Sequence, residues 1–275
     1  MKSLLASLFL ALAAAAGLAA VSGPALAEDT GLVPLRTLDD SRGWEAVGRL
    51  DIGGRAFCTG TLVGVDLVLT AAHCLYDRET GERVDAGEIE FLAGFRNGQA
   101  IAYRGVSRAV LHPGYAYGTE PGADRVRNDL ALLQLRQPIR NTRVRPFGIG
   151  GRTGAGKVVG VVSYAHDRAE APALQESCRV LEALDGVLVL SCAVDFGSSG
   201  APIFAFDGGA PRIVSVVSAK AQMAERPVAL GSALGVPLSE LHAAYLAAPA
   251  LDDGGPRVRR METPGAAPGA KFIRP

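Results

Sequence analysis

Short apolar segments separated by turn residues recur along most of the chain. Gly, Asp and Pro fall between the segments. Strands that are this short and numerous, with turns this frequent, favour barrels or a sandwich over a parallel sheet. We therefore predict strands within residues 46–52, 56–64, 66–70, 88–94, 107–112, 130–135, 157–165, 177–184, 186–194, 201–206 and 212–219.

A helical pattern stands out near the end of the chain, within residues 237–248. Leu238, Leu241 and Tyr245 recur there at spacings of three and four. These spacings place the three side chains on one face of a helix. The chain therefore predicts one amphipathic helix after the last predicted strand.

The strand pattern divides the chain into two all-β units. The first unit covers residues 43–147, and the second covers residues 157–248 and includes the helix, with Gly-rich sequence between them. Residues 28–42 form a polar, acidic lead or possible propeptide. Residues 249–275 are dominated by Pro, Gly, Arg and Asp, which predicts a disordered tail.

The first 27 residues have the pattern of a secretory signal peptide. Lys2 precedes an apolar run over residues 4–21, and the small residues Ala25 and Ala27 end the segment. This order predicts cleavage after Ala27 and a mature protein that is exported, secreted or periplasmic. The alternative is an uncleaved membrane anchor, because the apolar run approaches the length of a bilayer span. After signal removal we expect no association with the membrane.

Charge and cysteine content narrow the remaining possibilities. Basic and acidic side chains balance at 28 each, with no long run of either sign, which argues against nucleic acid or an anionic membrane surface as the main partner. Four cysteines in an exported chain predict disulfides, with three possible pairings. The local pairing Cys58–Cys74 and Cys178–Cys192 is the simplest. A zinc site is the alternative, but the chain has no CxxC pair, and His73 beside Cys74 has poor spacing for two ligands of one metal.

Two adjacent serines between glycines, Ser198 and Ser199, are candidate nucleophiles. A serine hydroxyl needs a base, usually a histidine that a carboxylate orients. Among the four histidines, His73 follows an apolar strand and precedes a cysteine, whereas we expect the others on the surface: His112, His166 and His242. Asp129 directly precedes the apolar segment 130–135, so it is the candidate for the orienting carboxylate.

Three motifs in this order, "LTAAHC", "NDLALL" and "GSSGAP", closely resemble those of the chymotrypsin/trypsin-type serine peptidases. The resemblance covers roughly residues 44–247. It is greatest to bacterial secreted members related to glutamyl endopeptidases, which often carry a cysteine seven residues before the reactive serine, as Cys192 precedes Ser199 here. The resemblance implies an all-β fold of two antiparallel six-stranded β-barrels with a C-terminal helix, and a site in the cleft between the barrels.

The resemblance also assigns roles to residues. It implies Ser199 as the nucleophile, His73 as base and then acid, and Asp129 as the group that holds the imidazole. The backbone N–H groups of Gly197 and Ser199 would form an oxyanion hole. The implied protein is a secreted serine endopeptidase that acts on polypeptides through an acyl-enzyme, as a monomer, without cofactor or metal.

The departures from the family pattern bear on activation and specificity. Ser198 stands where animal members carry an aspartate that pairs with a freed N-terminal amine, and a neutral serine cannot make that ion pair. By position we expect Ala193 at the floor of the specificity pocket and Ser215 to Val217 in its walls. Neither an acidic floor nor the histidine of glutamyl endopeptidases is present, since Val214 stands at the position expected for it. The sequence therefore predicts a small or medium apolar P1 residue.

Two other functions are alternatives to the predicted endopeptidase activity. The same scaffold can serve recognition alone, as a catalytically idle, trypsin-like binding protein. An esterase of the α/β-hydrolase class would need a G-x-S-x-G frame, another order of catalytic residues and alternating strands and helices. This sequence has none of the three.

Overall fold

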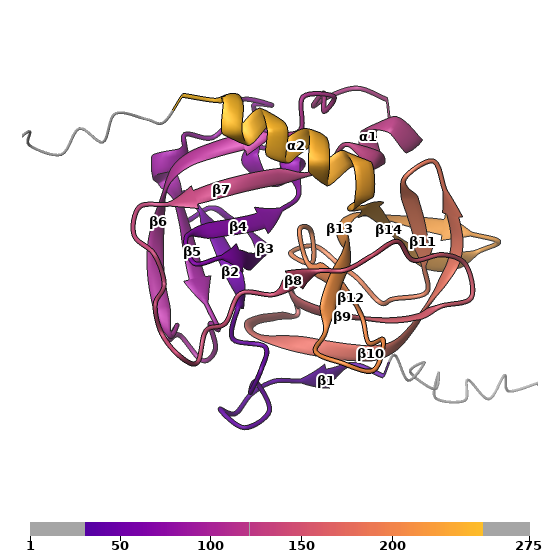
Figure 1. Ribbon diagram of the computed structural model, residues 1–275, viewed down its shortest axis with the longest axis horizontal. Coiled ribbons are helices and arrows are strands. Elements are labelled where there is room, and N and C mark those ends of the chain that lie inside the picture. Colours follow the sequence, from indigo (N-terminus) through magenta and orange to yellow (C-terminus); the bar gives the residue numbers. More distant parts are fainter. Residues whose placement is uncertain (1–30, 121, 250–275) are drawn as a thin grey trace, which may run out of the picture.

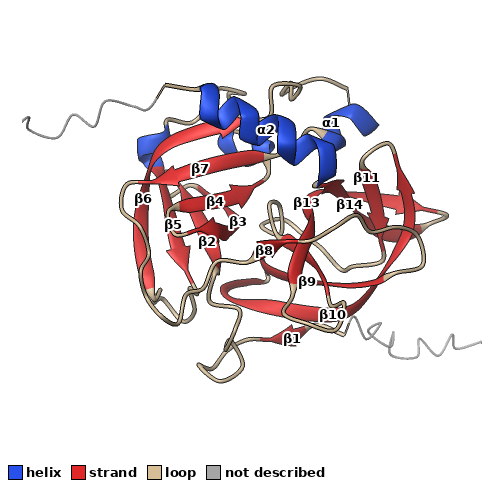
Figure 2. Ribbon diagram, in the orientation of Figure 1, coloured by secondary structure: helices blue, strands red, loops and turns tan. Residues whose placement is uncertain are grey.

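The computed structural model describes residues 31–120 and 122–249. Two strand-rich halves lie side by side, and a long helix crosses one end of the molecule (Figure 1; Figure 2). The predicted signal peptide and nearly all of the predicted tail lie outside the described residues. Within the described part, no helix is both long and apolar enough to cross a membrane.

The first half is a closed antiparallel barrel in the strand order β2-β3-β4-β7-β6-β5. Its apolar side chains turn inward, so that Leu50, Leu62 and Phe91 are fully buried. Leu, Val and Phe suit such positions because a strand side chain packs against its cross-strand neighbours on the same face. The strands are β2 (Val47–Ile52), β3 (Ala56–Gly64), β4 (Leu67–Thr70), β5 (Ile89–Ala93), β6 (Ala102–Leu111) and β7 (Ala131–Leu135).

The second half is also a closed antiparallel barrel, in the order β9-β10-β11-β14-β13-β12 and back to β9. These strands are β9 (Val158–Ala165), β10 (Arg168–Leu184), β11 (Val187–Leu190), β12 (Pro202–Ala205), β13 (Arg212–Met223) and β14 (Arg226–Ala233). Two short strands add to its edges, β1 (Val33–Pro34) on β10 and β8 (Gly148–Ile149) on β13. The structure therefore confirms the predicted fold of two six-stranded β-barrels.

The second barrel contains strands that the sequence pattern does not indicate. Strand β14 includes Pro227 and Gly231, two residue types that are depleted in strands. Strand β10 begins at Arg168 rather than near residue 177, and its pairing with β9 shifts register at two places. Each shift interrupts the alternation of inward and outward side chains, which is the signal that sequence reasoning uses.

The C-terminal helix α2 (Gly235–Ala247) packs against the first barrel although it follows the second in the chain (Figure 1). Leu241 is fully buried, and Leu238 and Tyr245 pack against the same core, as the helical spacing predicts. A short helix α1 (Ala123–Arg127) was not predicted. Two 3-10 helices complete the described elements, Ala72–Leu75 and Ala86–Glu88.

Aromatic side chains join the two barrels. The ring of Trp44 lies 5.8 Å from that of Phe147 and 5.1 Å from that of Phe204 on β12, measured between ring centroids. These large side chains belong to one continuous core that includes residues of both barrels. Because aromatic rings bury large areas and pack in specific geometries, the cluster fixes how the barrels face each other.

The segment before the first barrel packs on the second barrel. Val33 pairs with Leu174 of β10, and the N–H of Leu35 donates to the carbonyl of Pro172 at 2.8 Å. The Leu35 side chain is buried. Within the predicted lead, the segment around Leu35 thus contributes to the packed structure.

Candidate active site

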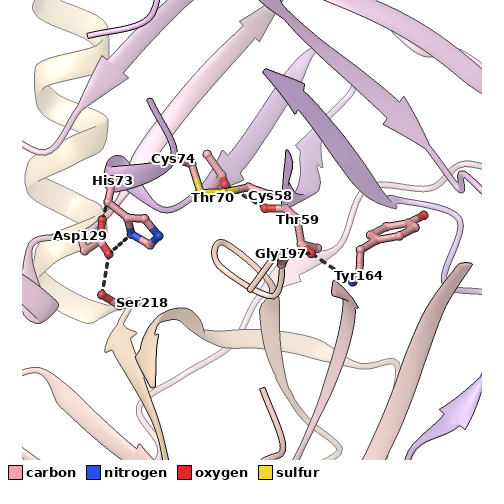
Figure 3. The surroundings of a disulfide bond; sticks show 9 residues. All are labelled: Cys58, Thr59, Thr70, His73, Cys74, Asp129, Tyr164, Gly197 and Ser218. Atoms are coloured by element: carbon pink, nitrogen blue, oxygen red, sulfur yellow. Dashed lines mark hydrogen bonds and ion pairs between the residues drawn. A yellow bond between two sulfur atoms is a disulfide. The ribbon is translucent and has the colours of Figure 1, made fainter. Parts of the chain in front are cut away.

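His73 is supplied by the first barrel. It belongs to the 3-10 helix that directly follows β4, and the disulfide from Cys74 to Cys58 of β3 ties this turn to the barrel (Figure 3). Ala71 and Ala72 before it are fully buried. The His73 side chain remains 16% exposed and faces the cleft.

Asp129 holds His73 through two atoms. Its Oδ1 accepts a hydrogen bond from the His73 backbone N–H at 2.8 Å, and its Oδ2 lies 2.6 Å from His73 Nδ1. Oδ2 also accepts a hydrogen bond from the Ser218 hydroxyl at 2.5 Å (Figure 3). An ionised carboxylate can only accept, so in this pair Nδ1 carries the hydrogen and Nε2 of the neutral ring is left as an acceptor. Nε2 points away from Asp129 (Figure 3).

The two adjacent serines have different surroundings. Ser198 is fully buried, and its hydroxyl donates to the carbonyl of Tyr164 at 3.1 Å. Ser199 is partly exposed and lines, together with His73, a cavity of about 350 Å³. Within the described residues no hydrogen bond joins the Ser199 hydroxyl to His73, a contact that often tightens only when substrate is bound. Of the two serines, only Ser199 shares the cavity with His73.

Glycine is required on both sides of the serines. Gly197 and Gly200 have positive φ angles of 96° and 79°. A Cβ on Gly197 would lie 2.3 Å from the Phe57 ring, and one on Gly200 would lie 2.1 Å from Thr70 Oγ1. No side chain larger than hydrogen fits at either position without moving the first barrel.

The first barrel holds the serine loop through Thr59 of β3. Its backbone N–H donates to the carbonyl of Ser199 at 2.9 Å. Its hydroxyl lies beside Gly197 and donates to the carbonyl of that residue at 2.9 Å (Figure 3). The N–H of Ser198 donates to the carbonyl of Asp195 at 2.9 Å. By contrast, the N–H groups of Gly197 and Ser199 donate to no group of the described residues. An N–H group without such a partner can donate to a bound oxygen atom, which is the role that the sequence predicts for both.

The walls of the cavity differ in part from the prediction. Val217 lines it, as expected, but Ser215 does not, because its side chain is fully buried and its hydroxyl donates to the carbonyl of Ser232 at 2.8 Å. Ala193 is not among the lining residues either, and its N–H donates to Gln175 Oε1. The lining residues from the second barrel are Val194, Asp195, Phe196, Ser199, Val217, Ser218, Ala219 and Lys220.

Sequence reasoning missed Ser218, Ala219 and Lys220. Strand β13 carries a bulge between Val217 and Ala219, so the alternation that runs from Ser215 through Val217 does not predict that Ser218 and Lys220 line the cavity as well. The available signal was a second serine three residues after Ser215, but the sequence offers no means to locate the bulge.

Two cations stand at the rim of the cavity, and each has a partner. Lys220 Nζ lies 3.2 Å from Asp195 Oδ1, and the guanidinium of Arg78 lies over the Phe196 ring at 5.3 Å. The N–H of Phe196 and the Lys220 ammonium both donate to the Asp195 carboxylate and lower its pKa. Asp195 therefore stays ionised and the Lys220 charge is compensated.

His73 also lines two neighbouring cavities, of about 320 and 830 Å³. Phe57, Tyr76 and Phe196 line the smaller one, and Tyr117, Arg125 and Leu230 lie in the larger. The three cavities adjoin because they share His73 and Arg78. Together they form a cleft that is longer than the cavity at Ser199 alone.

The other histidines lie away from this cleft or on its margin. His112 is buried, contrary to the prediction, because its Nε2 lies 3.0 Å from Glu240 Oε2 of α2 and its Nδ1 accepts from the N–H of Gly114. Burial lowers its pKa. His166 and His242 are exposed, as predicted, and His166 stacks on the Phe57 ring beside the smaller cavity.

The cysteines form the two local disulfides, Cys58–Cys74 and Cys178–Cys192. Within the described part of the chain, one group of potential metal ligands gathers, which is Cys58, His73 and Cys74. Both sulfur atoms of that group belong to the disulfide, so neither is available as a thiolate ligand.

The two closed barrels, with His73 and Asp129 paired on one and Ser199 on the other, define a chymotrypsin-like two-barrel protein. The chain belongs to the trypsin family, whose model matches residues 39–182. That match includes His73 and Asp129 and ends before Ser199.

The curated relatives are peptidases. Glutamyl endopeptidase of Bacillus licheniformis is 31% identical over 153 residues, which are 54% of this chain and 45% of that protein. Mouse cathepsin G is 37% identical over 97 residues, which are 35% of this chain and 33% of that protein. The chain thus matches less than half the length of these relatives.

A solved structure of a Glu endopeptidase superposes with a TM-score of 0.61. The superposition covers 74% of this chain and 91% of that one at 19% identity, which shows the shared fold.

Proposed function

We propose that the protein is an exported serine endopeptidase that hydrolyses peptide bonds through an acyl-enzyme on Ser199. The observation that carries the proposal is the His73–Asp129 pair, with Ser199 in the same cavity and Ser198 turned away from it. A serine becomes an effective nucleophile only when a positioned base can take its proton. Membership of the trypsin family supports the same chemistry.

The residues act in a fixed order. Ser199 Oγ attacks the scissile carbonyl carbon while its proton passes to His73 Nε2. The N–H groups of Gly197 and Ser199 donate to the oxyanion as negative charge develops on it. When the intermediate collapses, the C–N bond breaks and His73 gives the proton to the leaving amine. A water molecule then attacks the acyl carbon with His73 again as base. The bond from that carbon to Ser199 Oγ breaks, His73 returns the proton to Oγ, and the carboxylic acid product leaves.

The adjoining cavities favour an extended polypeptide as substrate. The cavity beside Ser199 offers the apolar side chains of Val194, Val217 and Ala219. Its Lys220 is already paired with Asp195, so an acidic side chain would have to compete for that cation. We therefore propose a small or medium apolar P1 residue, although the Bacillus licheniformis relative is a glutamyl endopeptidase. The two disulfides are compatible with export into an oxidising compartment.

The test is labelling of the purified, disulfide-bonded protein with a fluorophosphonate, followed by peptide mass spectrometry. We expect one adduct per molecule, on Ser199 and not on Ser198. Ser199→Ala and His73→Ala should abolish it, whereas Ser239→Ala, an exposed serine on α2, should label like the unaltered protein.

The same experiment separates the alternatives. Folded protein that takes up no fluorophosphonate would support an idle binding scaffold and refute the proposal. Labelled protein that hydrolyses simple esters but no peptide amide would point to an esterase. Cleavage of a peptide library would then give the P1 preference directly.

A further inference from the structure

Arg168 is a cationic side chain close to the loop that carries Ser199, but it lies outside the cavities that His73 lines. It opens β10, directly after the turn from β9, and its side chain is only 15% exposed. Its Nη2 donates to Ser198 Oγ at 3.3 Å and to Ser163 Oγ at 3.1 Å. Its Nη1 lies 3.0 Å from Asp167 Oδ1. The guanidinium thus joins the β9–β10 hairpin to the serine beside the proposed nucleophile.

The loop from Asp195 to Ser199 turns around the Ser198 hydroxyl. That oxygen accepts from the N–H of Asp195 at 3.3 Å and donates to the carbonyl of Tyr164 at 3.1 Å. The N–H of His166, in the hairpin turn, donates to the carbonyl of Phe196 at 2.8 Å. Hydrogen bonds therefore hold the loop against the β9–β10 hairpin. Arg168 supplies the charged donor among them.

The cost of burying Arg168 suggests that it has a role beyond packing. Its Nε is buried without a hydrogen-bond partner. Burial lowers its pKa, against the attraction of Asp167 and Asp195. A neutral side chain of similar length would avoid both penalties. What the cation adds here is a strong donor to two hydroxyl groups, one on each side of the hairpin–loop contact.

We propose that Arg168 is a positioning residue that fixes the oxyanion-binding N–H groups of Gly197 and Ser199 by anchoring Ser198 between them. The proposal rests on the proposed function and concerns the same site. Ser198 cannot move without shifting the peptide units on both sides of it, and these units carry the two N–H groups. Because such donors act on the oxyanion rather than on the bound substrate, their misplacement lowers kcat more than it raises KM.

The test compares Arg168→Met, which keeps length without charge, with Arg168→Lys, which restores a charged donor. Arg179→Met is the matched control, since Arg179 lies exposed on the same strand. We expect R168M to lower kcat on a peptide amide by about 100-fold, with KM changed less than about threefold. R168K should recover at least about tenfold of that loss, and R179M should behave like the unaltered protein.

The double variant R168M/S198A tests the route of the effect. If Arg168 acts through Ser198, the two losses should be less than additive, because S198A removes the contact with Arg168 that R168M has already lost, and adds only the loss of the bonds to Asp195 and Tyr164. Full additivity of the two losses, or R168M with unaltered kcat, would overturn the proposal. Should R168M fail to fold, S198A approaches the same contact from the loop side, and unaltered kcat in S198A would overturn it as well.

The outcome for the unaltered protein separates the two proposals. If it takes up no fluorophosphonate on Ser199, the proposed function fails and the role of Arg168 fails with it. If it labels at Ser199 and R168M labels at the same rate, only the role of Arg168 is refuted.

Discussion

Replacing Asp129 by Asn should abolish most activity while leaving the fold intact. Oδ1 faces the His73 backbone N–H, a donor that cannot change its role. The amide oxygen of the Asn must therefore stay on that side, and its NH₂ must face His73 Nδ1 and Ser218 Oγ. The NH₂ group is a donor, so Nδ1 has to become the acceptor and Nε2 then carries the hydrogen. A protonated Nε2 cannot take the proton of Ser199.

The size of the effect follows from this change of tautomer. The Asp129 side chain is 3% exposed and its two oxygen atoms take part in three hydrogen bonds, so little water is available to rescue the wrong arrangement. The loss of the correct tautomer in a triad of this kind costs about 10⁴-fold in kcat. That factor corresponds to about 5 kcal/mol of transition-state stabilisation.

The assay is the rate of fluorophosphonate labelling at Ser199 together with kcat on a peptide amide, near neutral pH. The thermal unfolding midpoint of Asp129→Asn serves as the control for folding. An Asn variant that is folded and keeps activity within about tenfold of the unaltered protein would refute the role that we assign to Asp129.

Three further outcomes are expected. Ser218→Ala removes one of three hydrogen bonds to Asp129. A hydrogen bond to a charged group is worth about 1.5 kcal/mol, which predicts roughly a tenfold lower kcat/KM. Unaltered kinetics would show that Ser218 is dispensable. Gly200→Ala should destabilise the protein by about 3 kcal/mol or more in urea unfolding. Gly208 is also at positive φ but has nothing within 4 Å, so Gly208→Ala should cost only about 1 kcal/mol. Equal losses of stability in the two variants would contradict the steric argument. Burial lowers the pKa of His112 below its ordinary 6.5, so the folded protein binds this proton less readily than the unfolded chain does. Stability is then full above pH 6.5 and falls as the pH decreases below it. His112→Gln should therefore flatten the dependence of the unfolding midpoint on pH below about 6.5.

The fold could be predicted because local pattern and motif agreed. Most strands of the first barrel follow the apolar segments closely, as β3 shows, whose bounds are those of the predicted segment 56–64. The exception is β6, which begins at Ala102, five residues before the predicted segment 107–112. The helix pattern of Leu238, Leu241 and Tyr245 matches the buried face of α2. These features depend on periodicity within one segment, which a single sequence contains.

What the sequence could not supply depends on register and on distant partners. Ser215 and Ser218 lie on one strand, and a bulge between Val217 and Ala219 brings Ser218, not Ser215, to Asp129. The sequence around His112 predicts a surface residue in a turn. In the structure its side chain is hydrogen-bonded to the carboxylate of Glu240, which lies on α2, 128 residues away. Arg168 has no motif around it, and its role follows only from its contacts with Ser163 and Ser198.

Each barrel donates hydrogen bonds to site residues of the other barrel. Thr59 of the first barrel donates to the backbone of Gly197 and Ser199 in the second, and Ser218 of the second donates to Asp129 of the first. Neither barrel alone therefore completes the site, and the geometry at Ser199 depends on the contact between them. The fluorophosphonate labelling rate should consequently decrease when the barrels separate, even if each keeps its own hydrogen-bonded sheet. Truncating Trp44 to Ala, which removes the ring packed on Phe147 and Phe204, should slow labelling although Trp44 touches none of the reacting groups.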